Sequence, residues 1–156
     1  MARIEYYDDP HAPRPNSLVV ATSAVIVDEQ GRILLQRRTD SGNWALPGGA
    51  MEMTESLSDS VVRETKEETG LDVMVTGIVG TYTDPKHIIA YTDGEVRRQF
   101  NICYTARIHG GELRASSEST ALAFIHPRDL DSLPIHHTQR LRLAHFLQHR
   151  ESPHLG

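Results

Sequence analysis

The sequence has almost no cysteine, since Cys103 is the only one among its 156 residues. A single thiol excludes an intrachain disulfide and a zinc site built from cysteines. Cys103 lies in an apolar stretch typical of a strand, which predicts a buried side chain. The chain also lacks any apolar run near the roughly 18 residues that a membrane span requires, and residues 1–10 lack the apolar segment of a signal peptide. We therefore expect a cytoplasmic protein without a membrane partner.

Positive charge is sparse as well. The 16 Lys and Arg residues are outnumbered by 21 Asp and Glu residues, which gives a net charge of -5, and no block of the chain is rich in Lys or Arg. Such a chain is poorly suited to the phosphate backbone of a nucleic acid, so we expect a small-molecule partner instead. A length of 156 residues predicts one folded domain with its own core.

The most informative stretch is WALPGGAMEMTESLSDSVVRETKEETGL, residues 44–71. It has a Pro47-Gly48-Gly49 turn, a polar loop and then a helical, acidic segment. At about 100° per residue, Glu64, Glu67 and Glu68 share one helix face, where their charges repel unless a cation offsets them. A site made only of carboxylates suits a hard divalent ion such as Mg²⁺, which keeps positions for water and phosphate oxygens. A solvated acidic helix surface is the alternative interpretation.

The same stretch resembles the signature of the Nudix hydrolase family: Gly, five residues, Glu, seven residues, then Arg-Glu-(apolar)-x-Glu-Glu-x-Gly-(apolar). The matching residues are Gly49, Glu55, Arg63, Glu64, Glu67, Glu68, Gly70 and Leu71. Thr65 stands where an aliphatic residue is usual, and we expect its methyl group to face the core. The resemblance implies that Gly49, Glu64, Glu67 and Glu68 bind the metal ions and that the three glutamates serve catalysis. It also implies that Glu55 and Arg63 brace the loop against the helix.

The order of elements, together with the resemblance, predicts an α/β fold of the Nudix type, an α/β/α sandwich with a central mixed sheet. Strands are expected at residues 18–27, 33–38, 71–82, 88–91, 97–108 and 121–125, and a closing helix at about 137–149. The first two strands are expected to form a hairpin. We divide the chain into an extended N-terminal arm (1–16), a Nudix hydrolase domain (17–150) and a C-terminal tail (151–156).

The Pro-rich arm carries Tyr6 and Tyr7 but has no core of its own. It predicts either a loosely attached terminus or a segment that contacts the second subunit of a homodimer, the commonest soluble assembly.

Residues outside the signature are candidates for substrate binding and for proton transfer. Arg37 and Arg38, at the end of an expected strand, and Trp44, just before the glycine turn, are candidates for contacts to the substrate. Glu118, in a polar loop ahead of the last expected strand, is the leading candidate for the general base. Glu112 and Glu95, each near a glycine turn, are the rival candidates outside the signature. A glutamate of the signature, most plausibly Glu64, is the alternative base.

The nine histidines do not predict a metal site. His136 and His137 are adjacent and point apart on a helix, while His145 and His149 are four residues apart but lack a third ligand.

The resemblance implies Mg²⁺-dependent hydrolysis of a diphosphate bond in a nucleoside diphosphate linked to another group, with Mn²⁺ as a substitute. ADP-ribose or a nucleotide sugar is the favoured substrate and a modified nucleoside triphosphate the second, because the signature fixes only the diphosphate site. A non-catalytic nucleotide-binding module is a third hypothesis. An isomerase of isoprenyl diphosphates would need a cysteine beside the metals, and Cys103 lies on an apolar strand.

Overall fold

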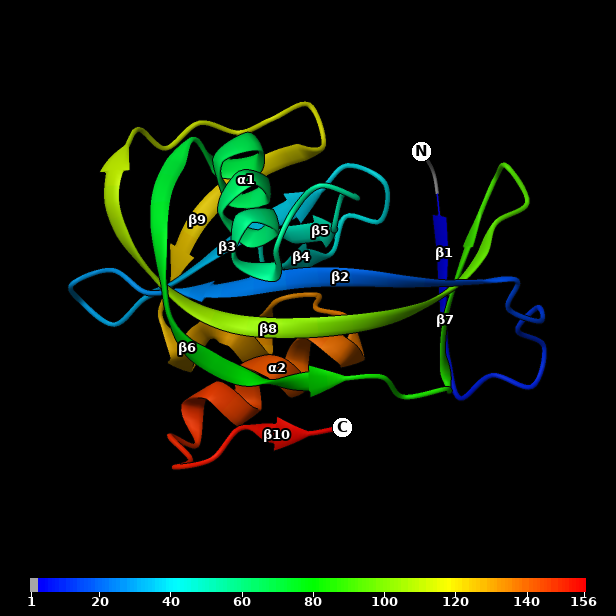
Figure 1. The fold of residues 1–156 in the computed structure, drawn as a ribbon. Coiled ribbons are helices and arrows are strands. Elements are labelled where there is room, and N and C mark those ends of the chain that lie inside the picture. Colours follow the sequence, from blue (N-terminus) through cyan, green and yellow to red (C-terminus); the bar gives the residue numbers. More distant parts are fainter. Residues whose placement is uncertain (1–2) are drawn as a thin grey trace.

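The fold is organised around one long strand, β8 (Val96–Gly111), in a computed structural model that describes residues 3–156 (Figure 1). The first part of β8 pairs with β7 (His87–Tyr91) and the remainder with β6 (Leu71–Tyr82), both antiparallel. Its other edge lies parallel to β2 (Ser17–Ile26). The large sheet is completed by β1 (Arg3–Tyr7) beside β7, β5 (Gly48–Ala50) beside β2, and β10 (His154–Leu155) beside β6. Parallel and antiparallel pairs occur together, so the sheet is mixed.

A second, three-stranded sheet has the order β4-β3-β9, formed by Trp44–Ala45, Ile33–Arg38 and Ser119–Ile125. Helix α1 (Leu57–Thr69) covers one face of the large sheet, and α2 (His137–Leu147) covers the opposite face (Figure 1). A short 3₁₀ helix, η1 (Pro127–Ser132), leads from β9 to α2. The predicted α/β/α sandwich with a mixed central sheet is thus confirmed.

Strand β2 supplies both halves of the core, since successive side chains of a strand point to opposite faces. Ala24 and Ile26 pack with Val61 of α1, whereas Val25 belongs to the cluster that contains Leu143 of α2. This burial on both faces explains the nearly continuous apolar run of the strand. Cys103 lies in the α2 cluster with no exposed surface, which confirms the prediction of a buried thiol.

Strands β2 and β3 do not form the expected hairpin, and this prediction is wrong. They share only an isolated bridge, between Val27 and Ile33, and β3 then pairs with β4 and β9 in the other sheet. Leu34 packs in the α1 cluster while Ile33 and Leu35 pack in the α2 cluster, and all three are fully buried. A strand buried on both faces needs neighbours that a two-stranded ribbon at the surface does not provide.

The expected N-terminal arm is extended, but part of it is a strand of the large sheet. Arg3–Tyr7 pair antiparallel with β7 at the edge of the sheet, and the Tyr7 hydroxyl donates to Asp84 Oδ2 at 2.9 Å. Backbone pairing with β7 fixes a segment that has no core of its own. The boundaries at residues 16 and 150 stay predictions. Within residues 3–156, no helix is both long enough and apolar enough to cross a membrane.

Helix α1 begins and ends at caps encoded in the sequence. Ser56 Oγ accepts the Asp59 N–H at 3.1 Å, and the Asp59 carboxylate accepts the Ser56 N–H at 3.0 Å, which forms a capping box. Gly70 follows the helix with a left-handed φ of 78°, and a Cβ there would lie 2.2 Å from the Glu112 carbonyl oxygen. Thr65 is fully buried as expected, but its hydroxyl has no hydrogen-bond partner within residues 3–156.

We expect Thr65→Val to raise the free energy of unfolding by about 1 kcal/mol, because a methyl group replaces a buried hydroxyl without a partner. Urea unfolding measures this difference. Thr69→Val is the matched control, since Thr69 Oγ1 donates to the Thr65 carbonyl at 2.6 Å and accepts the Leu71 N–H at 3.2 Å. That variant should be less stable than the wild type, and a similar loss in both variants would contradict the interpretation.

Candidate active site

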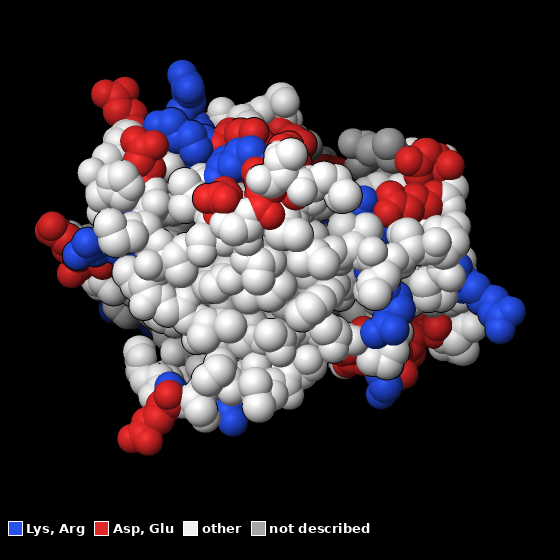
Figure 2. Space-filling view, in the orientation of Figure 1, with Lys and Arg blue, Asp and Glu red and all other residues white. Residues whose placement is uncertain are grey.

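The C-terminal half of α1 carries a group of carboxylates that Arg63 holds together. Arg63 Nη1 donates to Glu64 Oε1 at 3.0 Å and to Glu67 Oε2 at 3.2 Å. Its Nε and Nη2 donate to the Glu55 carboxylate, and Nη2 also donates to the Ala50 carbonyl oxygen at 3.2 Å. These hydrogen bonds lower the pKa of Glu55. The loop is thereby linked to the helix at two points, and Figure 2 shows acidic and basic side chains gathered over α1.

The Glu64 carboxylate lies against the backbone of the glycine turn. A Cβ at Gly49 would lie 2.6 Å from both Cδ and Oε1 of Glu64, so only glycine leaves room for this carboxylate. This turn is held in place by β5, because Gly49 of β5 pairs with Thr22 of β2.

Glu68 is the buried member of the group, with 4% of its surface exposed. Its Oε2 accepts the Gly48 N–H at 3.2 Å and a hydrogen bond from Gln36 Nε2. Burial, and then the like charge of Glu64, raise the pKa of Glu68 well above its usual value. Gln36 Oε1 in turn accepts the Ser119 hydroxyl at 2.6 Å. Sequence reasoning missed Gln36, although a single amide within an otherwise apolar strand start was a visible signal.

The donor set fits a hard divalent ion. Glu64, Glu67 and Glu68 offer only oxygen atoms, and the raised pKa of Glu68 reflects its burial and then the like charge of Glu64. A bound cation would remove that repulsion, and Mg²⁺ and its substitute Mn²⁺ both accept oxygen ligands.

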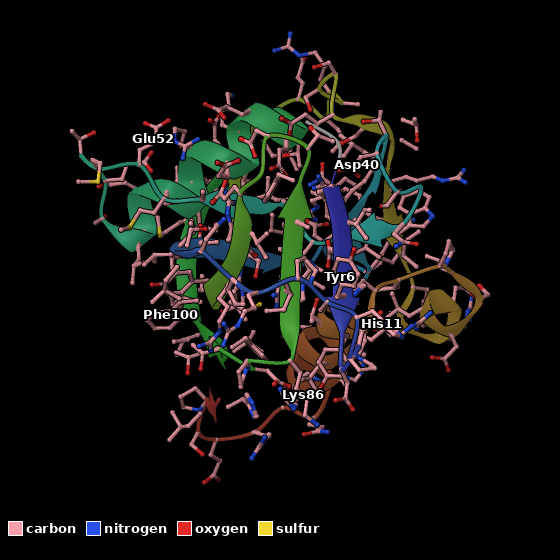
Figure 3. The ribbon with its side chains drawn as sticks, turned by 90° about the vertical axis from the view of Figure 1, so that its right-hand side faces the viewer. Tyr6, His11, Asp40, Glu52, Lys86 and Phe100 are labelled. Atoms are coloured by element: carbon pink, nitrogen blue, oxygen red, sulfur yellow. The ribbon has the colours of Figure 1, made fainter. Side chains whose placement is uncertain are left out.

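A small cavity of about 50 Å³ adjoins Gly48 and Gly49 on the side of the sheet away from α1. Three arginines line it, Arg3, Arg38 and Arg142. Arg38 pairs with Asp40 at 2.8 Å and Arg3 pairs with Glu5 at 2.7 Å; Figure 3 shows Asp40 beside one end of β1.

Arg142 differs from the other two because no acidic side chain pairs with it within residues 3–156. It is 3% exposed, and its Nε has no hydrogen-bond partner in that part of the chain. Burial lowers its pKa. Its guanidinium carbon lies 5.4 Å from the centre of the Tyr82 ring. A buried guanidinium with this much unused donor capacity suits an anionic ligand.

A larger cavity of about 440 Å³ lies next to the small one, since Gln99 and Arg142 line both. Its walls include Tyr82, whose ring stacks on His154 with centres 5.1 Å apart, and His87 of β7. Segments from both ends of the described chain therefore meet around one space.

The structure separates the candidates that the sequence placed together. Arg38 lines the small cavity, whereas Arg37 is exposed and donates to the Gly42 carbonyl oxygen at 3.1 Å. Trp44 packs against the α2 core cluster and lines neither cavity. Glu118 is exposed, and its carbonyl oxygen accepts the Thr39 N–H at 3.0 Å. It directly precedes Ser119, which is joined to Glu68 through Gln36.

Comparisons with known proteins agree with this architecture. A family model, the NUDIX domain, matches residues 17–147. A MutT-like protein of Streptomyces ambofaciens is 38% identical over 111 residues, which are 71% of this chain and 66% of that protein. An ADP-ribose pyrophosphatase of Methanocaldococcus jannaschii is 35% identical over 113 residues, 70% of this chain and 61% of that protein. The chain thus spans slightly less than two thirds of the length of these relatives.

Solved structures show the same relationship. An ADP-ribose pyrophosphatase from Streptococcus suis is 29% identical and superposes with a TM-score of 0.65, covering 88% of this chain and 96% of that one. The fold is that of the Nudix proteins. The chain belongs to the Nudix hydrolase family, whose members generally use divalent metal ions and act on small nucleotide-derived substrates.

We expect Arg142→Met to raise the free energy of unfolding by about 1 kcal/mol in phosphate-free buffer, because it removes a buried charge that has no acidic partner. Thermal unfolding gives the comparison. Arg140→Met is the control on the same helix, since Arg140 donates to the carbonyl oxygens of Leu130 and Leu133. This control should lose stability, and a loss at position 142 as well would mean that Arg142 has an internal partner.

Proposed function

We propose that the protein hydrolyses a diphosphate bond in a nucleoside diphosphate linked to another group, with Mg²⁺ as the metal ion and Mn²⁺ as its substitute. One observation carries the proposal: the glutamates of α1 meet the Gly48–Gly49 turn on one side, and the arginine-lined cavity adjoins the same turn. Acidic groups for metal ions and basic groups for phosphate oxygens are therefore neighbours.

Each residue has a distinct task in this proposal. Glu64, Glu67 and Glu68 hold the metal ions near Gly49, and Arg63 with Glu55 keeps the loop against the helix. Bound divalent ions supply charge neutralisation and a lower pKa for the attacking water. Arg38 and Arg142 donate to the phosphate oxygens from the small cavity. Arg37 and Trp44 lie outside both cavities, so we give them no part in binding the diphosphate.

The group attached to the diphosphate would occupy the 440 Å³ cavity. This volume lies within the range of about 300–1,000 Å³ common for small-ligand sites. Its aromatic wall at Tyr82 suits a flat or partly apolar group. ADP-ribose or a nucleotide sugar is our first choice, supported by the names of the pyrophosphatases with which the chain aligns, and a modified nucleoside triphosphate is the second.

We expect Glu67→Gln to abolish nearly all hydrolysis, because it deletes a metal-binding charge from a side chain that is 59% exposed and adds no packing defect. The measurement is release of AMP from ADP-ribose with Mg²⁺, extended to a panel of nucleotide sugars and triphosphates. Glu52→Gln is the control, since Glu52 is 62% exposed and lies 3.8 Å from Arg63 but occupies one of the unconstrained positions of the signature. Activity of Glu67→Gln within about tenfold of the wild type, about 1.4 kcal/mol of barrier, would show that the metal assignment is wrong.

We further propose Glu118 as the general base, since its loop joins Glu68 through Ser119 and Gln36 and its side chain is exposed, so that it can approach a bound substrate. Catalytic contacts often form only once substrate binds. Glu118→Gln should lower kcat by about 10²–10⁴-fold with unchanged metal affinity. The control is Glu112→Gln, an exposed glutamate in the same connection between β8 and β9. A decrease of less than about threefold would instead assign the general base to a glutamate of the signature, most plausibly Glu64.

We also propose a homodimer that involves β1. Ile4 is 60% exposed and Leu18 is 71% exposed, and the strand register places both on the face of the sheet opposite Glu5. Another candidate face is the broad area without charged side chains that Figure 2 shows over the middle of β6 and β8. Measuring the mass by light scattering distinguishes these two faces as the dimer interface. Ile4→Glu should give a monomer, whereas Ile78→Glu on β6 should not. A monomeric wild type would end this proposal.

A further inference from the structure

Three side chains from distant parts of the sequence converge at the edge of the large sheet. They are Glu5 of β1, His87 of β7 and His136, the residue that precedes α2. One ligand atom from each, a carboxylate oxygen or a ring nitrogen, lies within 4.8 Å of the other two. We infer that Glu5, His87 and His136 form a binding site for a transition-metal ion of the zinc type, separate from the glutamates of α1.

The spacing of the ligand atoms supports a tetrahedral ion. Glu5 Oε2 lies 3.1 Å from His87 Nε2 and 3.3 Å from His136 Nδ1. Ligands at about 2.0–2.2 Å from a tetrahedral zinc ion are separated by about 3.3–3.6 Å. The ring centres of the two histidines are 5.4 Å apart, so both rings can approach one ion from different sides. Two imidazoles and one carboxylate are a common ligand set for Zn²⁺ and related ions, and imidazole does not favour Mg²⁺.

The side-chain pattern of β1 points to the same place. In an edge strand with one solvated face, apolar residues ordinarily face inward and polar residues outward. In β1 the order is reversed, since Ile4 is 60% exposed while Arg3 and Glu5 turn toward the interior with side chains 16% and 20% exposed. A carboxylate turned inward needs a positive partner. Arg3 pairs with Glu5 Oε1 at 2.7 Å, and Oε2 faces the two imidazoles.

His136 Nδ1 lies 3.3 Å from Glu5 Oε2. As the cap of α2 it accepts the Thr138 N–H at 3.3 Å, and Thr138 Oγ1 lies 3.0 Å from the same nitrogen. In the tautomer with the proton on Nε2, Nδ1 cannot donate to Glu5 Oε2, so two acceptors face each other across this distance. A cation between them removes this conflict. The ion would bind the Nδ1 lone pair of His136 in place of the 3.3 Å hydrogen bond from the Thr138 N–H. It would also replace the proton in the hydrogen bond between His87 Nε2 and Glu5 Oε2.

The nearby charges are compatible with an ion. Arg3 is the closest fixed positive charge, and Asp40, 3.8 Å from Arg3, shares in balancing it. The ring of His137 packs against Tyr7 of β1, with ring centres 4.3 Å apart. The ion would fasten β1 to β7 and to α2, and His87 would place it at the wall of the 440 Å³ cavity. This inference does not depend on the proposed hydrolysis.

The test measures metal content directly. Metal-free protein is dialysed against Zn²⁺ in the presence of excess Mg²⁺. The zinc bound per chain is then measured by inductively coupled plasma mass spectrometry. Co²⁺ is used in parallel, since a tetrahedral site with nitrogen ligands gives a much stronger visible absorption than carboxylates and water. We expect one tightly held zinc ion per chain and a Co²⁺ spectrum of the tetrahedral type.

Matched variants assign the ion to this site. His136→Asn removes the imidazole but keeps an oxygen that caps α2, and Glu5→Gln keeps the volume of the side chain. Each should weaken Zn²⁺ binding by more than about 100-fold, beyond what the loss of an outer partner causes. His137→Asn should retain zinc, and so should Glu67→Gln, which lacks a ligand of the other site. Zinc retention by His136→Asn at the wild-type level, or no retained zinc in the wild type, would overturn the inference and leave only an ion pair between histidine and glutamate.

Discussion

Repulsion among the carboxylates of α1 is the constraint on which the site depends. Glu64, Glu67 and Glu68 are brought together by helix geometry alone, and such a cluster opposes folding unless positive charge is supplied nearby. Arg63 meets part of this need from within the same helix, because it contacts Glu64 and Glu67 and also reaches the loop at Glu55. The remaining imbalance is concentrated on Glu68, whose pKa is raised by burial and by Glu64. The protein alone leaves the cluster incompletely neutralised, which is the condition under which a divalent ion binds.

Charge is also incompletely balanced on the opposite side of the Gly48–Gly49 turn. Glu68 is held by Gln36 and by the Gly48 N–H, while the cavity beyond the turn is lined by arginines, of which Arg142 has no acidic partner within residues 3–156. Excess negative charge and excess positive charge are thus kept apart by a turn without side chains. In the proposed function, a diphosphate bound with its metal ions would bring both signs together and would complement the two halves at once. In this arrangement the ligand completes the electrostatics of the fold.

Local patterns predicted the structure well wherever the determining contacts are local. The strands at residues 33–38 and 71–82 have the predicted bounds, and the cap at Gly70 ends α1 where its left-handed conformation requires. The hairpin prediction failed because it assumed that neighbours in sequence are neighbours in a sheet, whereas burial on both faces moves β3 to a different sheet.

The same limit applies to the candidate site. Residues related by local spacing were predictable, whereas residues brought together by the fold were not. The glutamates of α1 follow from three- and four-residue spacing. Arg142 is significant because no acidic side chain pairs with it in the part of the chain that the structure describes, and no sequence pattern predicts such an absence. His136 was judged against His137, its neighbour in the chain. Its actual neighbours are Glu5 and His87, which come from other strands and become visible only in three dimensions.

The wall of the larger cavity depends on segments from both extremes of the described chain. Its walls include Tyr7 near the start of the chain and His154 and Gly156 at its other extreme, docked on β7 and β6 respectively. The core clusters on the two faces of the large sheet include neither of these segments. Removal of either segment by a protease would therefore take away part of the cavity wall while leaving the core clusters intact.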